Sequence, residues 1–209
     1  ARTTEAAAID PTELTWLPAD LATHKLVFVN GHYSQELSAI GDLPDGVRVL
    51  SLAEAMTSDE DLMAEHLGQI GGFEDAPVLA LNTAFIEDGF VIIIKNAELE
   101  IPIEVVFVSQ PAAFNSNYPR NLILAKDNAR MTILERHLGE GSYLTNHGFE
   151  VSVAGSSHVK HYRLLEDSAT GINLSTVKAR VGKDSIYDSF VLSIGGQLSP
   201  SEIHVACEE

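Results

Sequence analysis

The chain has 209 residues, enough for one large domain or for one elongated domain with an appendage. Its net charge of −17 would repel the phosphate backbone of nucleic acids, so we expect no nucleic-acid partner. No apolar run approaches the roughly 18–20 residues needed to cross a bilayer, so we expect no membrane partner either.

Acidic residues are concentrated in the first part of the chain. Residues 1–90 hold 3 basic and 16 acidic residues, whereas residues 91–209 hold 10 and 14. Within the acidic part, Asp10-Pro11 predicts the start of a short helix, because proline is favoured at the first helical position. Residues 26–29 predict a buried strand, Asn30-Gly31 a hairpin turn, and residues 33–37 the return strand.

Two short helices are expected next. Residues 47–50 predict a strand, and Ser51 and Glu54 have the spacing of a capping box at a helix start. A second helix is expected over 59–67, where the acidic run 58–61 suits a helix N-terminus better than a metal. Residues 77–85 are expected to be helical or irregular, and Asp88-Gly89 to form a turn.

From residue 90 the pattern changes to short strands separated by turn residues. Five later runs alternate apolar and polar residues: 149–153, 158–165, 172–177, 186–194 and 202–206. Leu122, Phe149, Ile172 and Leu198 recur about every 23–27 residues, a period typical of solenoids. The strands either pair as antiparallel hairpins in a sandwich or form coils of a parallel β-helix. The lack of two-residue hairpin signals favours the β-helix.

We therefore predict a mainly β protein with two regions, an acidic α/β region over residues 1–89 and a parallel β-helix over residues 90–209. Phe149, Val151 and Val153 are expected to face the interior, because their side chains alternate. The repeat stops in mid-coil, so we expect the natural chain to continue or another chain to cover this end. As given, the chain is expected to self-associate through residues 184–209.

Five histidines lie in the β region: His137, His147, His158, His161 and His204. His158 and His161 are three residues apart, so on a strand they point to opposite faces and cannot share a metal ion. Stacking of coils would place His161 near Asp188 or His137, depending on the register. We expect structural or surface roles for all five.

The remaining nucleophiles and soft ligands give no complete site. Cys207 and His204 are a soft-ligand pair, but a closed metal site needs four ligands. A single cysteine also excludes an internal disulfide, which is typical of a reducing compartment and predicts a cytoplasmic protein. Ser189 and Ser193 lack the Gly-x-Ser-x-Gly turn of hydrolases.

Carboxylates are abundant but carry no specific signal. Glu135 and Asp188 offer the pair that a glycosidase requires, as many other acids of this chain do. We therefore assign no catalytic residue and no metal ligand, and the residues of any cofactor site stay unknown.

Six segments, taken in order, resemble the SufB/SufD family, and within it SufD. They are residues 26–34, 80–85 with 88–89, 99–103, 119–123, 161–165 and 185–199. The resemblance covers about residues 26–206. It implies a right-handed parallel β-helix flanked by an N-terminal helical region and a C-terminal helical domain. It also implies a role in iron–sulfur cluster assembly, in a complex with SufB and the ATPase SufC.

The chain departs from the family in three respects. The usual tryptophan-rich N-terminal segment is absent, and Pro200 stands where the family usually has arginine. The second half of the β-helix and the C-terminal helical domain are missing. Because the cluster-related histidine of SufD lies in that part, no functional residue is carried over. No cofactor is expected on this chain, and an iron–sulfur cluster is implied for the full complex.

Two functions from different classes remain open. The first is a non-catalytic scaffold that acts with SufB-like and SufC-like ATPase partners, or as a homodimer. Such a protein is expected in the cytoplasm, or in the plastid of a photosynthetic eukaryote. The alternative is a carbohydrate-active β-helix enzyme, a lyase or esterase, a class that is typically exported. No export signal is evident at the start of the sequence.

Overall fold

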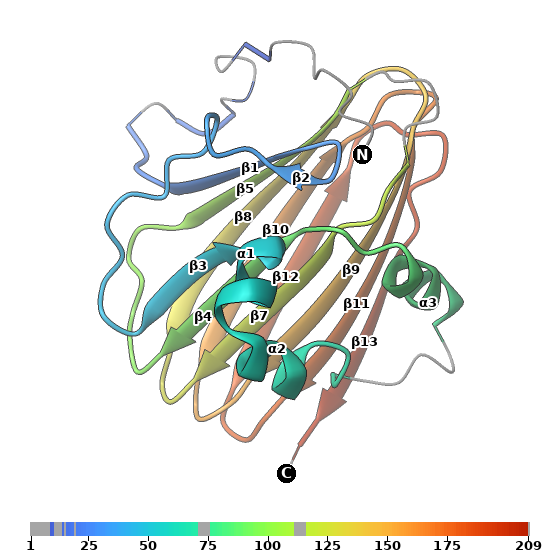
Figure 1. Cartoon of the computed structure of the whole chain (residues 1–209). Coiled ribbons are helices and arrows are strands. Elements are labelled where there is room, and N and C mark those ends of the chain that lie inside the picture. The colour runs from blue at the N-terminus through green and yellow to red at the C-terminus, as the bar shows by residue number, and fades with distance from the viewer. Residues whose placement is uncertain are drawn as a thin grey trace.

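A computed structural model gives the fold and describes residues 9–10, 14, 16–18, 20–70, 76–110 and 116–208 (Figure 1). The first sheet, sheet A, contains β1 (His24–Val29), β2 (His32–Tyr33), β5 (Ile103–Ser109), β8 (Arg130–Gly139), β10 (His158–Glu166) and β12 (Ile186–Ser193). Sheet B contains β3 (Val47–Ser51), β4 (Phe90–Lys95), β7 (Arg120–Lys126), β9 (Leu144–Val153), β11 (Ile172–Val181) and β13 (Ser201–Cys207), and the short β6 (Ser116–Asn117) pairs with β9.

The two sheets face each other as the walls of a solenoid. From β4 onward the chain passes from one sheet to the other, and each strand pairs in parallel with the equivalent strand one coil earlier. The lumen between the sheets is filled by side chains, among them Phe149, Val151 and Val153, all 0% exposed. The predicted parallel β-helix is therefore confirmed, and so is the inward orientation of these three residues.

The length of one coil differs from the predicted period. Leu144 pairs with Ile172, and Arg130 with His158, an offset of 28 residues in both sheets. The expected 23–27 residue spacing was wrong for the step from Phe149 to Ile172, because Phe149 pairs with Val177. Sheet B is apolar on both faces here, so an apolar residue does not by itself identify the side chains that face the lumen.

The outer face of sheet B is covered by helices α1 (Leu52–Ser58) and α2 (Glu60–His66), and α3 (Pro77–Ala84) lies beside β9 (Figure 1). Leu122 and Leu124 of β7 pack outward against Leu52 and Met63. The Ser51 side chain accepts a hydrogen bond from the backbone N–H of Glu54 at 3.1 Å, so the predicted helix cap is confirmed.

A buried ion pair fastens this helical layer to the sheet. Glu150 of β9 is 1% exposed and accepts hydrogen bonds from Arg120 Nη2 at 2.6 Å and Nε at 3.0 Å. Its carboxylate also accepts the backbone N–H groups of Gly68 at 2.8 Å and Ile70 at 3.1 Å. The chain after α2 is thus tied to the sheet by a carboxylate whose charge is compensated.

The early strands show how the acidic part joins the solenoid. β1 pairs in parallel with β5, and β3 pairs antiparallel with β4, so both sheets extend into the first 90 residues. The boundary between residues 89 and 90 stays a prediction.

The Asn30-Gly31 turn is confirmed, because both residues have positive φ and connect β1 to β2. The return strand is shorter than predicted, since the chain leaves the ladder after Tyr33. Pro11 of the expected first helix lies outside the described residues.

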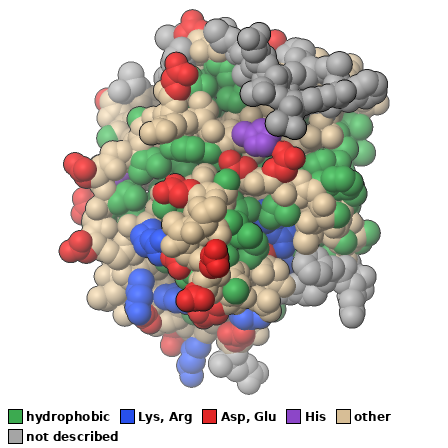
Figure 2. All heavy atoms as spheres, viewed as in Figure 1, with side chains coloured by type: hydrophobic (Ala, Val, Ile, Leu, Met, Phe, Trp, Pro, Cys, Tyr) green, Lys and Arg blue, Asp and Glu red, His purple; other side chains and the backbone are tan. Residues whose placement is uncertain are grey.

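Charged side chains of both signs share the surface. On the face seen in Figure 2, lysines and arginines lie among acidic side chains. Surface ion pairs include Arg48 with Asp59 at 2.6 Å and Lys95 with Asp127 at 3.6 Å. Within the described ranges, no helix is long and apolar enough to cross a bilayer.

Candidate functional site

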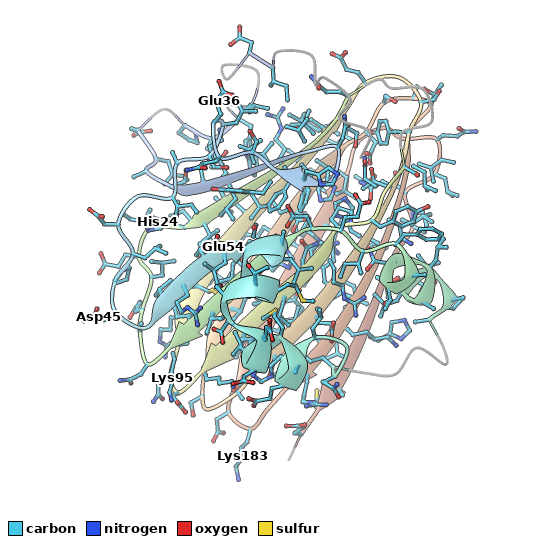
Figure 3. All side chains as sticks on the ribbon, in the orientation of Figure 1. His24, Glu36, Asp45, Glu54, Lys95 and Lys183 are labelled. Atoms are coloured by element: carbon cyan, nitrogen blue, oxygen red, sulfur yellow. The ribbon has the colours of Figure 1, made fainter. Side chains whose placement is uncertain are left out.

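The side chains that line the solenoid lumen change from apolar at one corner to polar at the opposite corner. Near the corner marked by Lys95 and Lys183 in Figure 3, the inner residues are apolar, as Ile133 of β8 and Val153 of β9 illustrate. Toward the opposite corner the inner rows become polar. The buried polar residues there are Glu135, His137, Tyr143, His147, His161, Arg163, Asp167, Asn173 and Ser175. We call this group the lumen cluster, and it is the candidate functional site.

Glu135 lies at the centre of the lumen cluster and binds two imidazoles. His137 is two residues further along β8, so both side chains point into the lumen, and its Nε2 contacts Glu135 Oε1. His161 comes from the adjacent strand β10, and its Nε2 lies 2.8 Å from Glu135 Oε2. All three are at most 3% exposed. A carboxylate only accepts hydrogen bonds, so both Nε2 atoms carry the proton.

The other nitrogen of each imidazole accepts a hydrogen bond from a further coil. The Tyr187 hydroxyl on β12 donates to His161 Nδ1 at 3.0 Å. Asn173 Nδ2 on β11 donates to His137 Nδ1 at 3.1 Å. A tyrosine hydroxyl and an amide nitrogen can each donate to an unprotonated Nδ1, so both contacts fit rings that carry the proton on Nε2.

A second carboxylate ends the chain of hydrogen bonds. Asn173 Nδ2 also lies 3.2 Å from Asp167 Oδ2, and the Tyr143 hydroxyl donates to Asp167 Oδ1 at 2.7 Å. Tyr143 and Asp167 belong to the turns that lead from sheet A to sheet B. The lumen cluster therefore links three successive coils through their side chains, in addition to the backbone ladders.

Burial and hydrogen bonding set the protonation of the cluster. Burial alone would raise the pKa of Glu135, but the hydrogen bonds from His137 and His161 outweigh it and hold the pKa well below its ordinary value. Burial lowers the pKa of His161, against the opposing effect of Glu135. Burial also raises the pKa of Tyr187 to about 12. An anionic Glu135 beside a neutral His161 is thus the stable form near neutral pH.

His147 is the exception in this well-paired group. It is 0% exposed, and neither ring nitrogen has a hydrogen-bond partner among the described residues. Its ring packs edge-on against Phe107 and His137, with centroids 4.6 and 4.3 Å apart. Burial lowers the pKa of His147 well below its ordinary value, so it is held as a neutral, largely apolar ring.

The structure brings together three of the five histidines singled out in the sequence. His158 and His161 point to opposite faces, as predicted, and His161 lies near His137 through their shared carboxylate. His158 is on the outer side of sheet A, and His204 of β13 is partly exposed near Glu202, 3.7 Å away.

The other candidate residues stay apart. Glu135 and Asp188 do not form a pair, because Glu135 faces the lumen while Asp188 faces outward and accepts a hydrogen bond from Tyr162. Cys207 is exposed and lies three residues after His204 on the same strand. Sequence reasoning missed the central role of Glu135 and His137. Their spacing of two residues on a strand is the signal that could have identified them.

The geometry explains what the lumen cluster can do chemically. Both Nε2 atoms donate their protons to Glu135, so neither offers a lone pair to a metal ion. No group of three or more His, Cys, Asp or Glu side chains among the described residues is arranged to hold a metal. The absence of metal ligands and of catalytic residues stays a prediction. What the cluster does is hold the buried carboxylate of Glu135 with two histidine donors.

Comparison with known proteins covers the whole solenoid. A family model described as the SufBD protein N-terminal region matches residues 18–105. A second, described as the SUF system FeS cluster assembly SufBD core domain, matches residues 107–209. The junction between the two matches falls within β5, in the middle of sheet A.

Two relatives extend the comparison. The chain is 28% identical over 198 residues to an iron–sulfur cluster assembly SufBD family protein of Synechocystis sp., covering 88% of this chain and 43% of that protein. It is 26% identical over 193 residues to the chloroplastic protein ABCI7 of Arabidopsis thaliana, covering 86% of this chain and 39% of that protein. The chain thus spans less than half the length of these relatives.

Proposed function

Because the chain belongs to the SufB/SufD family, we propose that it is a SufD-like, non-catalytic scaffold of the SUF iron–sulfur cluster assembly machinery. The observation that carries the proposal is the pair of family matches, which together cover residues 18–105 and 107–209. These matches favour the scaffold over the alternative of a carbohydrate-active β-helix enzyme.

The scaffold role is supported by the way the polar side chains are used. Glu135, His137 and His161 are sealed in the lumen and bound to one another, so they present no reactive group to a surface substrate. A catalytic group must reach its substrate within hydrogen-bond distance. The proposal therefore places ATP hydrolysis in a SufC-like partner.

The iron–sulfur cluster enters the proposal as cargo of the full complex. Protein-bound clusters are held mainly by cysteine thiolates, and Cys207 is the single cysteine here. The ligands of a cluster would therefore come largely from outside these 209 residues, with a SufB-like protein as the proposed partner. The cytoplasm, or the plastid of a photosynthetic eukaryote, is the proposed location.

Exposed apolar side chains at the last coil suit a partner-binding role. On the outer face of β12, Phe190 is 57% and Leu192 46% exposed, and on β13 Val205 is 52% exposed. β12 and β13 are the edge strands of sheets A and B, and exposed apolar side chains there are typical of protein interfaces. We propose that a SufB-like chain, or a second SufD-like chain, covers them.

Co-expression of the tagged chain with the SufB-like and SufC-like proteins of its own organism, followed by purification through the tag, tests the proposal. We expect mass spectrometry of the purified complex to find both partners, and expect ATP turnover to require the SufC-like chain. Phe190→Lys should reduce recovery of the partners, whereas Phe85→Lys, at an equally exposed apolar residue on the end of α3, should not. Recovery of neither partner, or ATP turnover by the chain alone, would contradict the scaffold role.

A further inference from the structure

Arg163 is a second buried charge of the lumen cluster, and its environment is unusual for an arginine. It lies on the inner face of β10 and is 1% exposed. Its Nη1 donates to Ser175 Oγ at 2.6 Å, and its Nη2 donates to Ser201 Oγ at 3.0 Å. The guanidinium lies over the Phe149 ring, 5.0 Å from the centroid. Each of these contacts is with a neutral group.

No carboxylate among the described residues forms an ion pair with Arg163. Its cross-strand neighbour is Glu135, but both oxygens of that carboxylate are bound by His137 and His161. The Arg163 Nε is buried and has no hydrogen-bond partner in the described part of the chain. A buried cation is costly unless it is paired and fully hydrogen-bonded.

Arg120 shows how the same protein satisfies a buried arginine. It is 2% exposed, and its Nε and Nη2 both donate to one oxygen of Glu150, at 3.0 and 2.6 Å. In Arg163 the equivalent Nε donor is unused, and the Nη2 donor meets a serine hydroxyl. Arg120 thus donates to an anionic carboxylate oxygen, whereas Arg163 has no such acceptor among its contacts.

The groups around Arg163 have a surplus of donors. The hydroxyls of Ser175 and Ser201 accept hydrogen bonds from Arg163, so their own protons remain to be donated. Together with the Arg163 Nε–H, this gives three donors around one positive charge, the chemistry that binds carboxylates and other small oxyanions. Ser175 is buried and Ser201 is exposed, so the guanidinium is held between a buried and an exposed hydroxyl.

We propose that Arg163, with Ser175 and Ser201, forms a binding site for a small anion of the carboxylate class at the β13 end of the lumen. The anion accepts the Arg163 Nε–H and the serine hydroxyl protons, and it neutralises the buried guanidinium. The site is independent of the proposed role in cluster assembly, because it depends on contacts within this chain alone.

Nuclear magnetic resonance of arginine side chains labelled at Nε tests the site, with formate as the probe at constant ionic strength. We expect a saturable shift of the Arg163 Nε–H resonance, with no shift of the Arg120 resonance, whose donor is already bound by Glu150. Thermal stability should rise with formate concentration in parallel, because a ligand that binds the native state stabilises it.

Two variants separate the site from general salt effects. Arg163→Gln removes the charge and should abolish the formate-dependent rise in stability. If that variant fails to fold, Ser201→Ala, at an exposed position, removes one donor and should weaken formate binding several-fold with an unchanged circular dichroism spectrum. A non-saturable shift that is equal for Arg163 and Arg120, or unchanged formate affinity in Ser201→Ala, would overturn the proposal.

Discussion

Glu150 and Glu135 are two buried carboxylates that are stabilised in different ways. Glu150 lies on β9 of sheet B and points away from the lumen, whereas Glu135 lies on β8 of sheet A and points into it. Glu150 is 1% exposed on the outer face and is bound by the Arg120 guanidinium and two backbone N–H groups. Glu135 is 0% exposed in the lumen and is bound by two imidazoles. Arginine stays protonated at any ordinary pH, whereas histidine does not. The side-chain donor of the outer pair therefore keeps its charge, whereas histidine donors can change theirs with pH.

The largest effect is expected from breaking the outer anchor. Arg120→Met leaves Glu150 buried with only its backbone donors, so the free energy of unfolding should fall by about 3–5 kcal/mol. Urea denaturation measures the change. Arg48→Met, at an exposed pair with Asp59, is the matched control and should cost about 0–1 kcal/mol. Equal losses for the two variants would mean that burial of the pair is unimportant.

A smaller loss is expected when the lumen carboxylate is removed. Glu135→Ala leaves the Nε2–H groups of His137 and His161 without an acceptor, so stability should fall by about 2–4 kcal/mol. Glu135→Gln keeps the volume and one acceptor oxygen, so it should lose less than the alanine variant. Chemical denaturation of both variants checks the order, and a glutamine variant less stable than the alanine variant would contradict it.

The proton sensitivity of the lumen predicts a stability loss in acid. The pKa values of His147 and His161 are lowered from 6.5 in the folded state, so the unfolded chain binds more protons as the pH falls below that value. Stability should therefore be constant above this range and decrease below it. Glu135, whose pKa is also lowered, adds a further loss in more acidic solution.

His147→Leu tests the origin of that pH dependence. The variant removes a buried ring without hydrogen-bond partners, so it should gain about 1 kcal/mol near neutral pH and lose less stability in acid than wild type. Thermal denaturation over a pH series measures both quantities. An acid loss in the variant as large as in wild type would assign the effect to groups other than His147.

The weakest effect concerns self-association through residues 184–209. Ile203 and Val205 face the lumen side of β13 and are 43% and 52% exposed, so we expect copies of the chain to associate, more at high salt, where repulsion between acidic surfaces is screened. Light scattering should show a lower association constant for Ile203→Lys. Leu81→Lys, at 40% exposure on α3, is the control. A monomer at high concentration and high salt would contradict this expectation.

The sequence predicted the fold better than the site. Alternation over 149–153 and the turn residues predicted strands, because strand periodicity is a local property, and the lack of hairpin signals favoured a parallel β-helix over a sandwich. The coil length was less accurate, since Leu122 and Phe149 are both apolar but face opposite sides of sheet B. The register that brings His161 to Glu135 depends on stacking of coils 28 residues apart, which no local pattern specifies.

The central claim is that an anionic Glu135 accepts hydrogen bonds from the Nε2–H groups of two histidines. Long-range nitrogen–proton correlation spectra of histidine side chains test it directly near neutral pH, where tautomers have distinct nitrogen shifts. We predict that His137 and His161 both carry a proton on Nε2 and that His161 is neutral. An unprotonated Nε2 in either ring would contradict the claim.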